Sequence, residues 1–257
     1  MTTAPPRRNA LSDFATGTGM LFRGTGLVTR NPRLLLLGLV PGFISFVVVV
    51  AALATLLYFV NDLAAAVTGF ADHWSADLRH AVRVLAAIGI GAVAVVTAVL
   101  TFTALTLTIG DPFYEEISKR VDELSGGAPE TGVPWHRALV WNLADSLRLL
   151  VLSVATSVVL FVVGFIPLVG QTVVPVLGAT VGGWLLAVEI SGVPFNRRGM
   201  RLRDRRRLLR ANRAMSLGFG VPVFVVFLVP FAAVLIMPGA VAGATLLTRR
   251  VLGQPGG

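Results

Sequence analysis

The chain carries LLLLGLVPGFISFVVVVAALATLLYFVN (34–61), a run of 28 uncharged residues between Arg33 and Asp62. A helix needs about 20 apolar residues to cross a hydrocarbon core about 30 Å thick. This run therefore predicts one tilted transmembrane helix over 34–60. A second run of 27 uncharged residues, between Arg83 and Asp111, predicts another over 84–109.

Two further uncharged runs are longer. The run from 149 to 188 has 40 residues, which fits two helices joined by a turn. The run from 214 to 248 has 35 residues, which is long for one span and short for two spans with a loop.

The composition supports a membrane protein. Hydrophobic residues make up 55% of the 257 residues and charged residues 14%, whereas a soluble domain has about 25% charged residues. This balance excludes an ordinary soluble enzyme. Cysteine is absent, which excludes disulfides and thiolate metal sites. The net charge is +9, which in a membrane protein indicates cytoplasmic loops and contact with anionic lipid headgroups.

The arginines predict the orientation. The segment 195–213 holds nine arginines and one aspartate, whereas 61–83 holds two arginines and three aspartates. By the positive-inside rule, we expect 195–213 in the cytoplasm and 61–83 outside. The N-terminus and 110–148 then also lie inside. Five arginines precede the first span: Arg7, Arg8, Arg23, Arg30 and Arg33.

Two interfacial helices are predicted beside the spans. No secretory signal peptide is apparent, and 1–8 is expected to be disordered because it is rich in Pro, Arg and Thr. Residues 9–30 predict a mildly amphipathic interfacial helix. A second one is expected over 110–123, with Asp111 as its N-cap and Pro112 at its first position. There, Glu116 is spaced to pair with Lys119 and Arg120.

An internal repeat relates FVVGFIPLVGQTVVP (161–175) to FVVFLVPFAAVLIMP (224–238). One Phe and two Pro recur at an offset of 63 residues. Proline removes a hydrogen-bond donor and clashes with the preceding turn, so two prolines eight residues apart should break each helix near mid-membrane. We therefore predict two Pro-broken hairpins, over 149–191 and 216–248. Pro-kinked helices that simply pack together are the alternative.

The broken segments provide candidate anion ligands. Unpaired backbone inside a bilayer must be buried in protein or line a wet cavity. Gly170, Gln171 and Thr172 would open a half-helix, and the N–H groups there attract anions. Thr245 belongs to the corresponding Gly-Ala-Thr of the second copy, at 243–245.

The basic segment allows two interpretations. It predicts a cytoplasmic helix on anionic lipid, with its apolar residues Met200, Leu202, Leu208 and Leu209 against the membrane. Alternatively, its cations concentrate anions at a pore mouth. Nucleic-acid binding is disfavoured because aromatic interleaving and a known module are missing. The membrane-surface candidates are Arg197, Arg198, Arg201, Arg203, Arg205, Arg206 and Arg207.

Catalysis finds little support in the sequence. His73, His80 and His136 lack metal-ligand spacing, and neither a phosphate-loop nor a hydrolase motif occurs. We therefore expect neither a catalytic residue nor a metal site nor a cofactor.

Five stretches carry a resemblance to a known family: NPRLLLLGLVP (31–41), DPFYEEISKRVDEL (111–124), FIPLVGQTVVPVLGA (165–179), VPFNRRG (193–199) and LGFG…MPGAVAGATLL (217–247). Together they resemble the CysZ-type sulfate permeases and the wider etoposide-induced membrane protein family. The resemblance implies two long spanning helices and two pairs of shorter, partly penetrating helices. The hairpins over 149–191 and 216–248 then need not cross the membrane fully. For 149–191, this competes with the interpretation as two full transmembrane spans.

The resemblance also points to an anion site and shows one departure from the pattern. Sulfate permeases of this type carry Pro-Gly-aliphatic-Arg-Arg before the first span, where backbone and arginines hold sulfate. The corresponding run here is Pro32-Arg33-Leu34-Leu35-Leu36. Arg30 and Arg33 are the nearby arginines that would substitute, and they adjoin the start of the first span.

The sequence thus predicts an all-α integral membrane protein of the plasma membrane. Its fold would comprise two long transmembrane helices, two Pro-broken helical hairpins and amphipathic interfacial helices, in one membrane domain over 1–257. The leading function is a small-anion permease, with sulfate as the best candidate. The rival is a membrane scaffold or envelope-homeostasis protein without a substrate. We also expect a homo-oligomer, because small residues allow close helix approach: Gly178, Ala179, Gly182 and Gly183.

Overall fold

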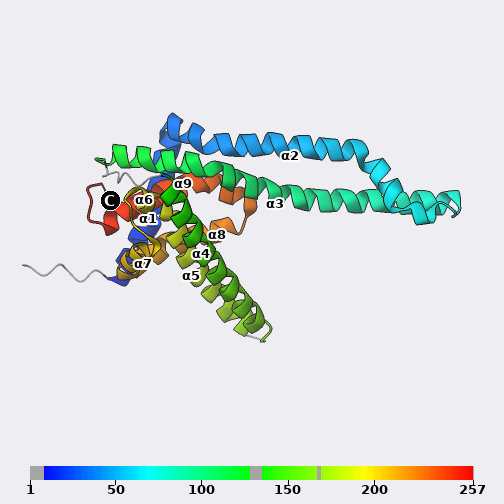
Figure 1. Ribbon diagram of the computed structural model, residues 1–257. Helices are drawn as coiled ribbons and strands as arrows, with labels where there is room; N and C mark the ends of the chain where they lie inside the picture. Colours follow the sequence, from blue (N-terminus) through cyan, green and yellow to red (C-terminus); the bar gives the residue numbers. More distant parts are fainter. Residues whose placement is uncertain (1–8, 128–134, 167–168, 257) are drawn as a thin grey trace, which may run out of the picture. The chain divides into compact units, whose positions relative to one another are not determined.

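The computed structural model describes residues 9–127, 135–166 and 169–256, and the side chains of all of these except 135–146, Val169 and Pro230. The expectations for 1–8 and for Pro167 lie outside the described residues. Where described, the chain is all-helical, as predicted (Figure 1). Its elements are α1 (Ala10–Arg30), α2 (Pro32–Val67), the short 3₁₀ helix η1 (Gly69–Ala71), α3 (Ala76–Leu124), α4 (Trp135–Gly164), α5 (Val169–Ile190), α6 (Gly192–Arg197), α7 (Leu202–Ala211), α8 (Arg213–Phe227) and α9 (Pro230–Val251).

The chain divides into two compact units. The smaller unit, Leu39–Asp111, holds most of α2 and α3, joined through η1. Arg83 pairs with Asp72 at 2.8 Å beside this connection. Both helices expose large apolar side chains and line an apolar groove of about 680 Å³ within this unit. Such surfaces suit contact with lipid rather than with water.

The larger unit, Met1–Gly38 with Pro112–Gly257, holds the packed core. Within it, α1 packs against α8 and α9. A Cβ atom at Gly17 would clash with the backbone at Met215, and one at Gly24 would clash with Gly243. The glycines that weaken α1 as an isolated helix therefore allow its backbone to approach its neighbours closely.

The predicted interfacial placement of α1 needs correction. The helix itself forms as expected over 9–30, and Leu11 and Phe22 on its apolar face are exposed. Another face, however, is buried within the protein, so α1 is part of the core and does not merely lie on its surface. The buried residues are Gly17, Met20, Leu21, Gly24 and Val28.

The 63-residue sequence repeat is also a repeat of backbone structure. Both α4 and α8 end in two amides that bond to carbonyls three residues earlier, over N···O distances of 3.1–3.4 Å. In each copy, the next helix then resumes bonding to the carbonyl four residues earlier. The donors are Phe165, Ile166 and Gly170 in the first copy, and Leu228, Val229 and Ala233 in the second. The following helix packs against the preceding one in both copies, and Figure 1 shows α4 and α5 running side by side.

The expectation that the second proline of each copy breaks the helix is wrong. Pro175 lies inside α5 and Pro238 inside α9. Pro112 likewise lies inside α3, so the helix predicted to start at Asp111 is a continuation of the second span. Apolar helices tolerate internal proline because neighbouring helices and side chains can satisfy the freed backbone groups.

Two other placements differ from the predictions. The basic segment forms two helices, α6 and α7, which are separated by a turn at Gly199 with a φ of 69°. Leu202 and Leu209 belong to the buried core, so they do not face a membrane. Gly183, expected at a subunit interface, faces α8 within the chain, since its Cβ would lie 2.8 Å from Val221. Gly182 likewise faces Phe224 of α8.

Candidate anion-binding site

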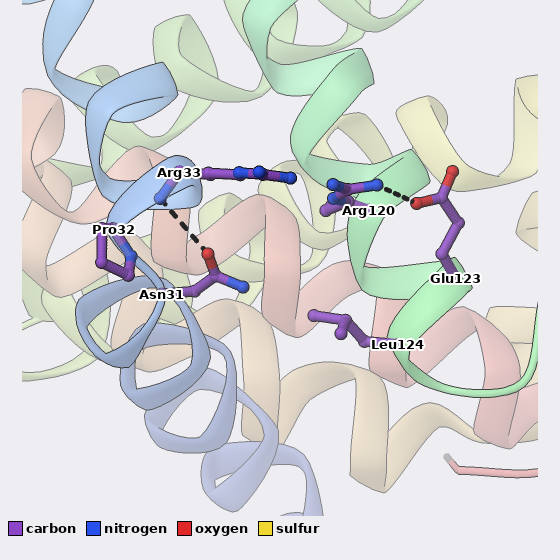
Figure 2. Close-up of a pocket in the computed structure, with 6 residues that line it drawn as sticks. All are labelled: Asn31, Pro32, Arg33, Arg120, Glu123 and Leu124. Carbon is purple, nitrogen blue, oxygen red and sulfur yellow. Dashed lines mark hydrogen bonds and ion pairs between the residues drawn. The ribbon is translucent and has the colours of Figure 1, made fainter.

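A cavity of about 520 Å³ lies at the amino end of α2, inside the larger unit. Its lining comes from the α1–α2 junction and from the last turns of α3 (Figure 2). The lining residues are Asn31, Pro32, Arg33, Arg120, Glu123 and Leu124.

The local sequence explains why a helix begins at this cavity. Asn31 has an extended backbone with a φ of −112°, which ends α1. Its side-chain oxygen accepts the N–H of Arg33 at 3.2 Å, and its carbonyl accepts the N–H of Leu35 at 3.0 Å. Asn31 thus caps α2, and Pro32 suits the first helical position. The positive end of the α2 dipole therefore lies at the cavity.

Two guanidinium groups from different helices converge in the cavity. Figure 2 shows Arg33 extending toward Arg120, with Arg120 between Arg33 and Glu123. Arg120 donates a hydrogen bond to Glu123 at 2.6 Å, and both side chains are about 40% exposed. The formal charge of the three groups is therefore +1. Paired guanidinium forks of this kind bind the oxygens of tetrahedral anions through several hydrogen bonds.

Only one of the two arginines predicted to bind the anion lines this cavity. Arg33 lines it, whereas Arg30 is exposed at the end of α1 and does not line it. Sequence reasoning missed Arg120 because its spacing suggested a pair with Glu116, whereas in the structure Arg120 pairs with Glu123. An i, i+3 spacing from Arg120 to Glu123 was the available signal.

The candidate ligands of the repeated segments lie elsewhere. Gly170, Gln171 and Thr172 occupy the first turn of α5, and the side chains of Gln171 and Thr172 are exposed. Thr245 was expected to face a hydrated interior, and this is wrong. It is fully buried in protein, with its hydroxyl 2.9 Å from the carbonyl of Val241 and 3.0 Å from the hydroxyl of Ser118.

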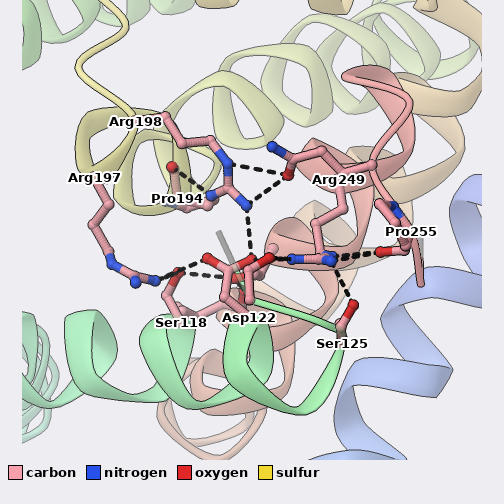
Figure 3. A network of polar contacts seen from close by, with 12 residues as sticks. Ser118, Asp122, Ser125, Pro194, Arg197, Arg198, Arg249 and Pro255 are labelled. Carbon is pink, nitrogen blue, oxygen red and sulfur yellow. Dashed lines mark hydrogen bonds and ion pairs between the residues drawn. The ribbon is translucent and has the colours of Figure 1, made fainter. Parts of the chain in front are cut away.

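The basic segment divides into buried and exposed arginines. Arg197 and Arg198 pair with Asp122, at 2.9 and 2.7 Å (Figure 3). Arg205 is buried and donates to the carbonyl of Val188 at 2.9 Å, near the carboxyl end of α5. These three side chains therefore differ from the expected surface arrangement. The side chains of Arg201, Arg203 and Arg207 are exposed, and Arg206 is half-buried.

The helices define the class of protein. Within the described residues, five helical stretches are long and apolar enough to cross a membrane. The protein is a multi-pass integral membrane protein, as the sequence predicted. The candidate spans are Pro32–Val67, Ala76–Leu124, Leu147–Gly164, Gly170–Arg197 and Phe231–Val251.

Comparison with known proteins identifies the family. The family profile described as "Sulfate transporter CysZ/Etoposide-induced protein 2.4" matches residues 20–238, so the chain belongs to this family. This confirms the resemblance and the assignment to the cell membrane, and it places the chain in a family of transporters rather than enzymes.

Individual relatives carry the same name. The sulfate transporter CysZ of Pectobacterium atrosepticum is 26% identical over 250 residues, which cover 95% of this chain and 88% of that protein. The sulfate transporter CysZ of Pseudomonas fluorescens is 32% identical over 157 residues, covering 60% of this chain and 63% of that protein. The matched segment thus spans less than two thirds of the Pseudomonas relative.

Proposed function

We propose that this chain is a permease for sulfate or a similar small oxyanion, and that the cavity at the amino end of α2 receives the anion. One observation carries this proposal: Arg33 and Arg120, from separate helices, converge on one cavity at a capped helix start. Family membership supports sulfate as the substrate class.

Arg120 can replace the second arginine of the Pro-Gly-aliphatic-Arg-Arg pattern, which this chain lacks. The run after Pro32 contains one arginine followed by leucines, so neighbouring residues cannot supply two guanidinium groups. Arg120 supplies the second group from α3. Two guanidinium groups, at the positive end of the α2 dipole, offer hydrogen-bond donors that suit the oxygens of a tetrahedral anion.

Other parts of the chain take supporting roles in this proposal. The pairs α4–α5 and α8–α9 act as hairpins that need not cross the bilayer fully. The exposed Gln171 and its neighbours Gly170 and Thr172 contact the passing anion. A homo-oligomer shields the hairpins from lipid, with Gly178 and Ala179 at the contact.

The exposed face of α7 binds anionic lipid headgroups. Arg203, Arg207 and Arg210 recur at intervals of four and three residues on an amphipathic helix, and all three are exposed. Its inner face is fixed by Leu202, Arg205 and Leu209, which are buried. Each cation near an anionic membrane surface contributes about 1 kcal/mol to lipid attraction.

Equilibrium binding of labelled sulfate to the purified protein tests the proposal. Wild-type protein should bind sulfate saturably, and Arg33→Ala with Arg120→Ala should weaken binding at least about tenfold, since two charge-assisted contacts are lost. Arg203→Ala with Arg207→Ala is the matched control, because it removes the same charge from an exposed face. Absence of saturable wild-type binding would contradict the permease and favour a scaffold that binds lipid through α7.

A further inference from the structure

Two neighbouring acidic residues at the end of α3 have different surroundings. Asp122 is buried and accepts hydrogen bonds from three arginines at 2.7–3.0 Å (Figure 3). Glu123 faces the cavity, is 45% exposed and accepts a hydrogen bond from Arg120 at 2.6 Å, while the charges of Lys119 and Arg197 also act on its carboxylate. The buried cluster fixes the backbone here, whereas the Glu123 carboxylate can leave by a side-chain rotation.

The bond between Glu123 and Arg120 is easily exchanged. Exposed ion pairs contribute little to stability, because water and salt compete with them. An anion that contacts both Arg33 and Arg120 must share the guanidinium that Glu123 now occupies. The carboxylate and the anion are therefore competitors for Arg120.

Charge balance makes this competition depend on the valence of the anion. Arg33, Arg120 and Glu123 carry +1 together, so one monovalent anion neutralises the cavity with Glu123 in place. A dianion leaves these three groups at −1, and displacement of the Glu123 carboxylate from the cavity restores their neutrality. Since Coulomb energy scales with the charge of the ligand, the carboxylate opposes a dianion twice as strongly as a monoanion.

We propose that Glu123 is a displaceable internal counter-ion that determines the preference of the site between divalent and monovalent anions. Glu123 bonds to Arg120 when the site is empty and releases Arg120 when a dianion binds. This inference rests on the proposed function, because it assigns a role to Glu123 within the same cavity.

Competition binding tests the role of Glu123. Labelled sulfate is bound to the purified full chain at constant ionic strength, and chloride is added as the monovalent competitor. Glu123→Gln keeps the shape and can still accept a hydrogen bond from Arg120. At a separation of about 8 Å in water-like dielectric, it should tighten sulfate binding about fivefold and chloride binding about twofold.

Two further variants separate local from general effects. Glu115→Gln removes an equal charge from an exposed position of the same helix and should change sulfate binding by less than about twofold, because its side chain does not line the cavity. Glu123→Asp keeps the charge and should not tighten sulfate binding. Unchanged or weaker sulfate binding in Glu123→Gln overturns the inference, as does an equal gain in Glu115→Gln.

The outcome remains distinguishable from failure of the proposed function. If wild type binds sulfate and the Arg33/Arg120 double variant does not, the site stands whatever Glu123 does. If the wild type and that double variant bind sulfate equally, the site itself is wrong, and the inference about Glu123 falls with it.

Discussion

Asp122, in the last turn of α3, accepts a hydrogen bond from Arg249, in the last turn of α9, over 3.0 Å, and both side chains are buried. The same carboxylate binds Arg197 and Arg198 at the end of α6. One acid thus joins three helix ends. The excess positive charge is balanced in part by backbone carbonyls, since Arg249 also donates to Ser125, Gly127 and Pro255.

The first prediction concerns this carboxylate. Asp122→Asn should lower the stability of the folded protein by about 3–5 kcal/mol, because it leaves three buried guanidinium groups without their counter-ion. Thermal unfolding in detergent, followed by circular dichroism, would measure the shift of the midpoint. Glu115→Gln, an equal charge change at an exposed position, serves as the control. A wild-type midpoint for Asp122→Asn would show that the cluster is dispensable.

The second prediction uses two glycines of α1 that are two residues apart. A Cβ at Gly24 meets the backbone of α9, whereas a Cβ at Gly26 meets nothing within 4 Å. Gly24→Ala should therefore destabilise the protein by about 1–3 kcal/mol through overpacking. Gly26→Ala should stabilise it by up to about 1 kcal/mol, since alanine is the better helix former. Unfolding midpoints that move in the same direction would contradict the packing of α1.

A third prediction tests the repeated hairpins. Gln171→Leu should lower sulfate flux while leaving the unfolding midpoint unchanged, because it removes an exposed hydrogen-bonding group and no packing anchor. Val173→Leu, an exposed apolar exchange in the same turn of α5, should leave flux unchanged. Full flux in Gln171→Leu would indicate that this turn is only a helix boundary.

The fourth prediction concerns lipid. Replacing Arg203, Arg207 and Arg210 by Gln should abolish the preferential retention of anionic over zwitterionic lipid, since each cation contributes about 1 kcal/mol. Lipid that copurifies from mixed nanodiscs can be quantified by mass spectrometry. The triple Arg→Lys variant keeps the charge and should retain the preference. Equal retention in the Gln variant would exclude α7 as the lipid surface.

The sequence predicted the parts of the fold that depend on local composition. The lengths of the uncharged runs predicted where α2 and α3 lie. The 63-residue repeat predicted that α4 and α8 end in matching ways. The effect of proline was overestimated at Pro175 and Pro238. The rule counts the lost donor and the clash with the preceding turn, whereas in an apolar helix neighbouring helices and side chains can satisfy the freed backbone groups.

The site could be predicted only in part. Arg33 followed from its place before the first span, but Arg120 required knowledge of which helix ends meet. The periodicity of a helix predicts which residues share a face, but it does not predict which other helix packs against that face. For the same reason, the sequence predicted Arg198 and Arg205 as surface cations. In the structure, tertiary packing buries Arg198 against Asp122 and Arg205 against the carboxyl end of α5.

Uptake of labelled sulfate into liposomes that contain the purified protein is the most direct test of the permease. Wild-type protein should give saturable uptake well above that of empty liposomes. Arg33→Ala with Arg120→Ala should reduce it about tenfold or more, because two charge-assisted contacts to the anion are lost, while Arg203→Ala with Arg207→Ala should not. Wild-type uptake no faster than in empty liposomes, or full uptake in the Arg33/Arg120 double variant, would contradict an anion path through this cavity.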